Sequence, residues 1–127
     1  MPYRRIGQTP DAIAPDGSEV RLLLRNQQGS MAHFTLEPGS ISIAVAHRTV
    51  EELWYFTAGS GEMVVGDEVF SVERGISVHI PVGLRFQFRS DGEHPLEAVA
   101  VTMPPWPGDD EATPAPPYWS NEPDALT

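Results

Sequence analysis

The chain contains no cysteine and no lysine among its 127 residues. The lack of cysteine excludes disulfides, thiolate nucleophiles and cysteine-ligated zinc or iron–sulfur centres. The lack of lysine excludes Schiff-base chemistry and a lysine-based phosphate site. The sequence also has no Gly-x-Ser-x-Gly nucleophile elbow and no phosphate-binding glycine-rich loop before a helix. These absences argue against the usual hydrolases, kinases and aldolases.

Basic residues and long apolar runs are scarce as well. Eight arginines stand against 18 acidic residues, which gives a formal net charge of -10. Phosphate backbones and anionic lipid surfaces repel such a chain, so we expect neither nucleic acid nor a membrane as a partner. No run reaches membrane-spanning length, and the first residues lack the apolar region of a signal peptide. We therefore expect one soluble, cytoplasmic domain.

The regular structure that the sequence predicts consists of strands alone. About nine short segments with alternating apolar residues, from 20–25 to 96–103, are separated by Gly or Pro turns. Gly66-Asp67 is a typical two-residue turn and predicts a hairpin between 62–65 and 69–72. No segment is convincingly periodic at about 3.6 residues, as a helix would be. The pattern predicts an all-β protein, an antiparallel sandwich or barrel.

The stretch from Gly39 to Gly59 carries the strongest alternation and the most informative polar residues. Its first half places Ile41, Ile43, Val45 and His47 on one face, and its second half presents Glu52, Trp54 and Phe56. Because successive side chains of a strand point to opposite faces, His47 and Glu52 are predicted to project into the same interior.

The turn at Pro38-Gly39 predicts how this stretch pairs with the strand before it. If the turn is a two-residue hairpin connection, three apolar pairs form on the face of His47. The pairs are Leu36 with Ile41, Phe34 with Ile43 and Ala32 with Val45. His33 and His79 are predicted to face away from His47, and His94 lies in a polar loop.

Two flanking segments differ from the predicted barrel at 20–103. Residues 1–19 lack a regular period and are interpreted as an N-terminal arm that covers a sheet edge or reaches a partner subunit. Residues 104–127 form a tail with seven prolines, which precludes a central strand or a long helix. The tail also carries Trp106, Tyr118 and Trp119, whereas disordered tails are poor in aromatics. We expect it to dock on its own barrel or a neighbour's.

The central stretch resembles the first sequence motif of the cupin superfamily, Gly-x5-His-x-His-x(3,4)-Glu-x6-Gly. The matching positions are Gly39, Val45, His47, Glu52 and Gly59. A second stretch is similar to the second cupin motif, Gly-x5-Pro-x-Gly-x2-His-x3-Asn. Its positions are Gly75, Pro81, Gly83, Phe86 and Ser90, and a 15-residue spacer, 60–74, separates the two motifs.

The resemblance implies a small single-domain cupin: a double-stranded β-helix, or jelly-roll barrel, usually dimeric, with its site inside the barrel mouth. Cupins that use a metal hold it with two histidines and a glutamate from the first motif and one histidine from the second. Val45 and Phe86 occupy two of these four positions, so only His47 and Glu52 match. A transition metal in an enzyme site needs three or more protein ligands. We therefore expect no metal cofactor. If a divalent metal is present, its ligands are His47 and Glu52.

Three functions follow from this pattern. The first is a small-molecule-binding cupin, with His47 and Glu52 as its polar pair and as the candidate catalytic residues. The ligand would be a small organic molecule, and Val45, Trp54 and Phe86 would form the apolar lining. The second is a metal-dependent cupin enzyme, a dioxygenase or isomerase, that recruits a further ligand to His47 and Glu52. The third is a structural or interaction module that binds through its tail. We expect a homodimer in each case. His47 and Glu52 could also be a buried structural pair.

Overall fold

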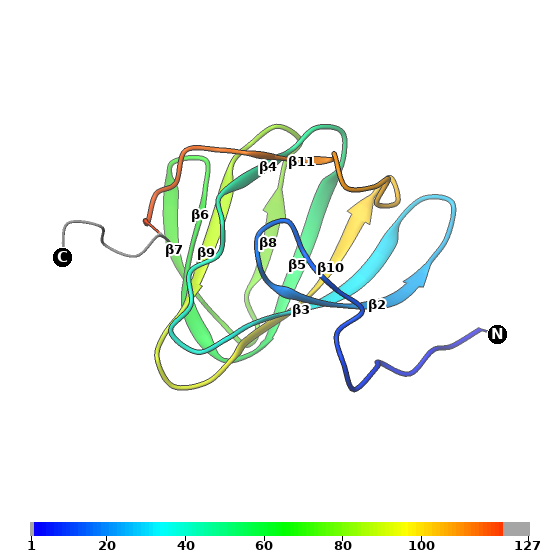
Figure 1. Ribbon diagram of the computed structural model, residues 1–127, viewed down its shortest axis with the longest axis horizontal. Coiled ribbons are helices and arrows are strands. Elements are labelled where there is room, and N and C mark those ends of the chain that lie inside the picture. Colours follow the sequence, from blue (N-terminus) through cyan, green and yellow to red (C-terminus); the bar gives the residue numbers. More distant parts are fainter. Residues whose placement is uncertain (1, 121–127) are drawn as a thin grey trace.

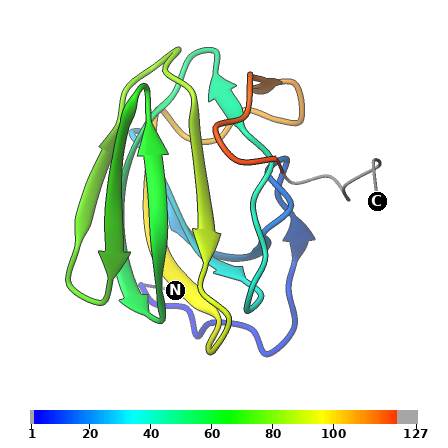
Figure 2. The ribbon, with the colours of Figure 1, turned by 90° about the vertical axis from the view of Figure 1, so that its left-hand side faces the viewer.

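The computed structural model describes residues 2–120 as two antiparallel sheets that face each other (Figures 1 and 2). The order of the six-stranded sheet is β1-β2-β3-β10-β5-β8, and that of the five-stranded sheet is β11-β4-β9-β6-β7. The strand bounds are Ala12–Ile13 (β1), Glu19–Arg25 (β2), Ser30–Leu36 (β3), Val45–His47 (β4), Glu51–Ala58 (β5), Ser60–Val65 (β6), Glu68–Glu73 (β7), Ser77–Ile80 (β8), Phe86–Ser90 (β9), Leu96–Met103 (β10) and Ala112–Pro114 (β11). This architecture confirms the predicted all-β jelly-roll barrel. None of the described residues forms a helix that could cross a membrane.

The local signals in the sequence predicted most strands well. The hairpin of β6 and β7 turns at Gly66-Asp67, with Val65 opposite Glu68. The strand predicted at 96–103 is β10, and it alternates buried and half-buried residues along its whole length. The barrel interior is filled by side chains from both sheets, among them Trp54, Phe56, Met63, Phe86 and Phe88. Period-two alternation located these side chains because each strand buries one face against the other sheet.

The pairing predicted across Pro38-Gly39 is wrong. Strand β3 pairs with β10 and β2 in one sheet, whereas β4 pairs with β9 and β11 in the other. The segment between β3 and β4 therefore crosses from sheet to sheet and does not fold back as a hairpin. Ser42 holds this crossing in place, because its N–H donates to the Phe88 carbonyl (2.8 Å) and its hydroxyl accepts from the Phe88 N–H (2.9 Å).

The alternation predicted over 41–44 is also reversed by this crossing. Ser42 and Ala44 are buried, whereas the side chain of Ile43 is 46% exposed. The expected pattern resumes at Val45 and His47, which are both buried. The face of His47 was therefore predicted correctly although its strand partners were not.

The arm and the tail each add a short strand at a sheet edge. In the arm, β1 pairs with β2, and in the tail, β11 pairs with β4. Figure 2 shows the tail, in orange to red, beside β4. Pro114 is compatible with β11 because this strand lies at the edge of its sheet, where a missing N–H is tolerated. Residues 121–127 of the predicted tail lie outside the described residues.

The turn between β5 and β6 requires Gly59, the last glycine of the first motif. Its φ is 79°, and a Cβ at this position would lie 2.2 Å from the carbonyl oxygen of Pro95. A side chain there would meet both a left-handed backbone and a fixed neighbouring backbone.

We therefore expect Gly59→Ala to lower the free energy of unfolding by about 2 kcal/mol or more. Gly92→Ala is the matched control, because a Cβ at Gly92 meets nothing within 4 Å, and its effect should stay within about 0.5 kcal/mol. Urea unfolding of both variants measures the difference. Equal stability losses would contradict the packing argument.

Candidate functional site

A pocket of about 510 Å³ opens between the sheets, and all five residues predicted for the site line it. These residues are Val45, His47, Glu52, Trp54 and Phe86. The arm contributes residues 12–16 to the wall, β2 and β3 contribute mostly apolar side chains, and the tail contributes Trp106. The site is therefore built by three parts of the chain, of which the sequence predicted only the barrel.

His47 lies at the end of β4 with 4% of its surface exposed. The rings of Phe86 and Trp106 pack against its imidazole in T-shaped arrangements, with both ring centroids 5.1 Å away. Burial disfavours the charged form and lowers the pKa of His47 to about 4, although the negative charge of Glu111 opposes this shift. At neutral pH His47 is therefore an uncharged imidazole.

Glu52 lies on β5, and only 2% of its surface is exposed. Its Oε1 accepts a hydrogen bond from Trp54 Nε1 at 2.8 Å and lies 3.9 Å from His47 Nδ1. Burial raises the pKa of Glu52 to about 7; the Trp54 hydrogen bond lowers it, and the charges of Asp16 and Glu111 raise it further. Because His47 is neutral, the two residues do not form an ion pair.

His47 Nδ1 is buried and has no hydrogen-bond partner among residues 2–120. Such atoms are rare in folded proteins, because an unpaired buried polar group costs the full free energy of its desolvation. An unpartnered nitrogen beside a buried carboxyl group indicates a place where a ligand group can bind.

The arm brings a third ionisable group, Asp16, to the wall of the pocket. Asp16 is buried, and its Oδ1 accepts hydrogen bonds from the backbone N–H (2.9 Å) and the hydroxyl (2.6 Å) of Ser18. Burial nevertheless raises its pKa. No pattern in the sequence points to this residue, because Pro15-Asp16-Gly17 is indistinguishable from an ordinary surface turn.

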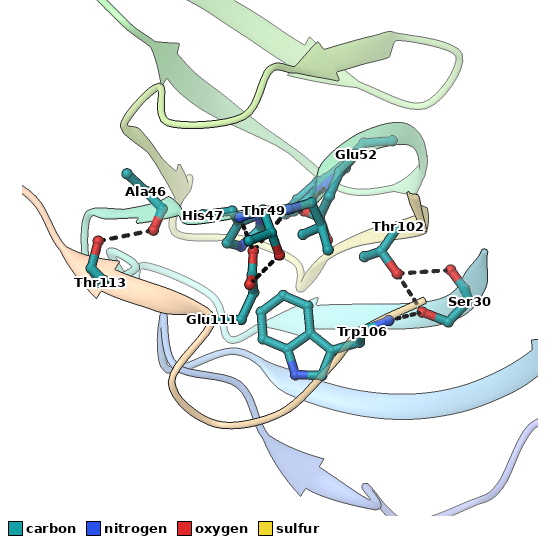
Figure 3. A network of polar contacts seen from close by, with 11 residues as sticks. Ser30, Ala46, His47, Thr49, Glu52, Thr102, Trp106, Glu111 and Thr113 are labelled. Atoms are coloured by element: carbon teal, nitrogen blue, oxygen red, sulfur yellow. Dashed lines mark hydrogen bonds and ion pairs between the residues drawn. The ribbon is translucent and has the colours of Figure 1, made fainter. Parts of the chain in front are cut away.

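The tail covers the pocket beside His47 with the indole of Trp106 (Figure 3). The backbone N–H of Trp106 donates to the hydroxyl of Ser30 at 2.9 Å, and that hydroxyl is also hydrogen-bonded to Thr102. These bonds fix the tail at the end of β10, so Trp106 is held against the imidazole by contacts with two strands.

Glu111 anchors the tail to the loop between His47 and Glu52. Its carboxylate accepts from the Thr49 N–H (2.6 Å), the Thr49 hydroxyl (2.6 Å) and the Val50 N–H (2.8 Å), and its carbonyl accepts from the Arg48 N–H (2.9 Å). Burial raises the pKa of Glu111, but these hydrogen bonds and His47 lower it more, so the net shift is downward. Figure 3 shows its side chain pointing to Thr49 beside His47. Glu111 therefore fixes the loop that connects the two polar residues of the site.

The donor set does not fit the metal site that the cupin motifs imply. Val45 and Phe86, at two of the four ligand positions, are direct partners across β4 and β9 and form an apolar pair. The other histidines do not replace them. His33 is 3.1 Å from Glu97, outside the pocket, exposed His79 is 2.8 Å from Glu51, and His94 is exposed in a loop. Within residues 2–120, no group of three or more His, Asp or Glu side chains is arranged to hold a metal ion.

Loss of the Glu111 carboxylate should loosen the loop at 48–50. We expect Glu111→Ala to lower the free energy of unfolding by about 2 to 4 kcal/mol, because two backbone N–H groups lose their acceptor. Hydrogen exchange at the Thr49 and Val50 amides should accelerate. Asp110→Asn is the control, because the Arg48–Asp110 pair is exposed and its loss should cost less than about 1 kcal/mol. Unchanged amide exchange in Glu111→Ala would contradict the anchoring role.

The opposite pKa shifts of Glu52 and His47 predict opposite pH dependences of stability. The folded protein binds the Glu52 proton more tightly than the unfolded chain, so Glu52 lowers stability as pH rises from 4.5 to about 7. His47 binds its proton less tightly when folded, so it lowers stability as pH falls from 6.5 to about 4.

We therefore compare the free energy of unfolding of Glu52→Gln with that of wild type at each pH. The difference should favour the variant more at about pH 7 than at about pH 5, by on the order of 2 kcal/mol. For His47→Gln, the difference in free energy of unfolding from wild type should instead favour the variant more at about pH 5 than at about pH 7. Urea unfolding at the two pH values measures both differences. The same sign for both variants would refute the assignment.

Comparison with known proteins identifies the family. The family model described as "Cupin domain" matches residues 32–102. The uncharacterized protein MJ1618 of Methanocaldococcus jannaschii is 30% identical over 103 residues, which cover 77% of this chain and 82% of that protein. The xanthan biosynthesis protein XanB of Xanthomonas campestris is 28% identical over 85 residues, which cover 67% of this chain and 18% of that protein. The chain thus spans less than a fifth of the length of XanB.

Two solved structures share the fold. A Streptomyces PAC13 variant with uridine superposes with a TM-score of 0.73 at 11% identity, covering 91% of this chain and 92% of that one. An uncharacterized Klebsiella pneumoniae protein with a double-stranded β-helix domain gives a TM-score of 0.67 at 17% identity, with coverages of 91% and 92%. The family match, the relative of similar length and the two-sheet barrel agree, and the chain belongs to the cupin family.

Proposed function

We propose that this cupin binds a small organic molecule in its barrel pocket and does so without a metal. The observation that carries the proposal is the unpartnered, buried Nδ1 of His47, which lies beside Glu52 in a pocket of about 510 Å³. This volume is typical of sites for small organic ligands, which span about 300 to 1,000 Å³. The Streptomyces PAC13 variant, solved with uridine, supports this class of occupant for the fold.

The walls favour a ligand with an apolar body and one polar end. Phe34, Trp54, Phe86 and Trp106 line the cavity as aromatic surfaces. The polar end would meet neutral His47, which can donate or accept one hydrogen bond at Nδ1 according to its tautomer. Glu52 can donate to the ligand when it is protonated and can accept when it is ionised. The pair could bind a ligand or transfer a proton without further groups.

The apolar pair Val45 and Phe86 is the reason for proposing that the site holds no metal. A bare divalent cation between these side chains would lose its hydration without gaining ligands. The position of the tail favours a binding pocket over an interaction module. Its residue Trp106 packs on His47 and is not free to bind a partner.

Elemental analysis and a fragment screen on untagged full-length protein test the proposal. We expect far less than one metal ion per chain, and we expect bound fragments to shift the indole N–H signals of Trp54 and Trp106 in NMR spectra. Trp119 is an internal control, because it lies over Arg89 and does not line the pocket. Trp106→Ala should weaken fragment binding, whereas Trp119→Phe should not.

Two outcomes would overturn the proposal. Stoichiometric Fe, Mn, Ni or Zn that is lost in His47→Ala would support a metal-dependent cupin enzyme instead. A fragment screen that moves neither Trp54 nor Trp106 would remove the evidence for a small-molecule site.

A further inference from the structure

Two buried carboxyl groups from distant parts of the chain, Asp16 and Glu52, line the pocket, and a third, Glu111, binds the loop at 48–50 beside it. Asp16 comes from the arm, Glu52 from β5 and Glu111 from the tail, and all three are buried. Asp16 and Glu111 are close enough for their charges to raise the pKa of Glu52. The hydrogen bonds of Ser18 and of the loop at 48–50 stabilise the charges of Asp16 and Glu111. Within the described part of the chain, the Glu52 carboxyl group accepts one hydrogen bond, from the Trp54 N–H.

The described chain supplies no buried cation to balance these carboxyl groups. Four arginines are paired with acidic side chains elsewhere: Arg21 with Glu19, Arg48 with Asp110, Arg85 with Asp67 and Arg89 with Glu62. Arg4, Arg25 and Asp109 line the pocket, but all three are exposed. Charges in contact with water are screened and stabilise a buried carboxylate little. Because His47 is neutral, it does not supply the missing charge either.

The unpartnered Nδ1 of His47 is a second, independent sign that this end of the pocket is completed by a ligand. It lies 3.9 Å from Glu52 Oε1, so one ligand atom between the two side chains could contact both. Aromatic surfaces surround this point, since Phe86 and Trp106 flank the imidazole and Trp54 contacts Phe86 at a centroid distance of 5.9 Å. Aromatic rings attract cations that lie over their faces.

We propose that the ligand of this pocket is a small organic amine whose ammonium group lies against Glu52 and whose apolar body packs on Trp54, Phe86 and Trp106. The inference rests on the proposed small-molecule function and names its ligand class. An ammonium group donates to the Glu52 carboxylate and to His47 Nδ1 and supplies a buried positive charge that residues 2–120 do not. A neutral hydroxyl has one O–H to donate, to Glu52 or to His47 Nδ1, and it leaves the carboxylate charge unbalanced. An anion would meet the buried carboxyl groups of Asp16 and Glu52, and the arginines of the pocket wall, Arg4 and Arg25, are exposed to water.

Three probes of nearly equal shape separate these classes: phenethylamine, phenethyl alcohol and phenylacetate. Each is titrated into the full-length protein at about pH 8, where Glu52 is mostly ionised, and binding is followed at the Trp54 and Trp106 indole N–H signals. We expect the amine to bind about tenfold more tightly than the alcohol, because a charge-assisted hydrogen bond replaces a neutral one. We expect no measurable binding of phenylacetate.

Glu52→Gln keeps the shape of the side chain and removes its charge, so it should reduce the affinity for the amine to that for the alcohol. Glu51→Gln is the matched control, because it makes the same chemical change on the adjacent, outward-facing residue, which contacts His79. It should leave the preference for the amine unchanged. Loss of the preference in Glu51→Gln but not in Glu52→Gln would overturn the assignment of the ammonium group to Glu52.

Binding of the alcohol or of phenylacetate at least as tight as that of the amine would overturn the ligand class and leave the proposed function intact. The same conclusion follows if none of the three probes binds while the fragment screen still shifts Trp54 and Trp106. Failure of both the probes and the screen would reject the ligand class and the small-molecule function together.

Discussion

The burial of His47 and Glu52 beside each other, with no buried arginine among residues 2–120, is the constraint on which the site depends. Both residues lie in a barrel interior whose other side chains are mostly apolar. Burial disfavours the charged form of each side chain, so it lowers the pKa of the imidazole and raises that of the carboxyl group. The two pKa values thereby move past each other, and at neutral pH a neutral imidazole faces a carboxyl group that is close to its midpoint. A pair in this state can exchange a proton with a ligand more easily than an ion pair could.

The tail has a structural role in maintaining this pair. Residues 48–50 connect His47 to Glu52, and a loop this short would leave several backbone N–H groups without partners if nothing covered it. Glu111 accepts from two of them and packs its charge near the imidazole. Trp106 closes the other side of the ring. A proline-rich segment suits this role, because it crosses the barrel in an extended conformation and needs few backbone partners of its own.

The sequence predicted the barrel and the inward face of its site because period-two alternation is a local property. His47, Glu52, Trp54 and Phe86 could be assigned to the interior from a few neighbouring residues each. The pairing of β3 could not be assigned in this way, because Pro38-Gly39 is equally suited to a hairpin turn and to a crossing between sheets. The choice depends on β10, whose residues pair with residues of β3 that lie 60 to 72 positions away in the chain.

Asp16 and Glu111 could not be predicted for a related reason. Each belongs to a segment without periodicity, and each reaches the site through contacts that the sequence does not encode locally. The Glu111 carboxylate meets Thr49 across 62 residues of sequence. Spacing therefore identified the polar residues of the motif, whereas the residues that tune their charges became visible only in the folded chain.

The exchange of two motif histidines for Val45 and Phe86 changes the chemistry of the barrel without changing its frame. The two positions are neighbours across β4 and β9, so their side chains lie side by side on the inner face of the sheet. With apolar side chains there, the ring of Phe86 packs against His47, and Glu52 accepts from the Trp54 N–H alone among the residues that the structure describes. A metal ion would have neutralised the carboxylate and used the free nitrogen of the imidazole. If no metal binds, as we propose, both needs fall to the ligand of the pocket, and the ammonium group of the proposed amine meets both.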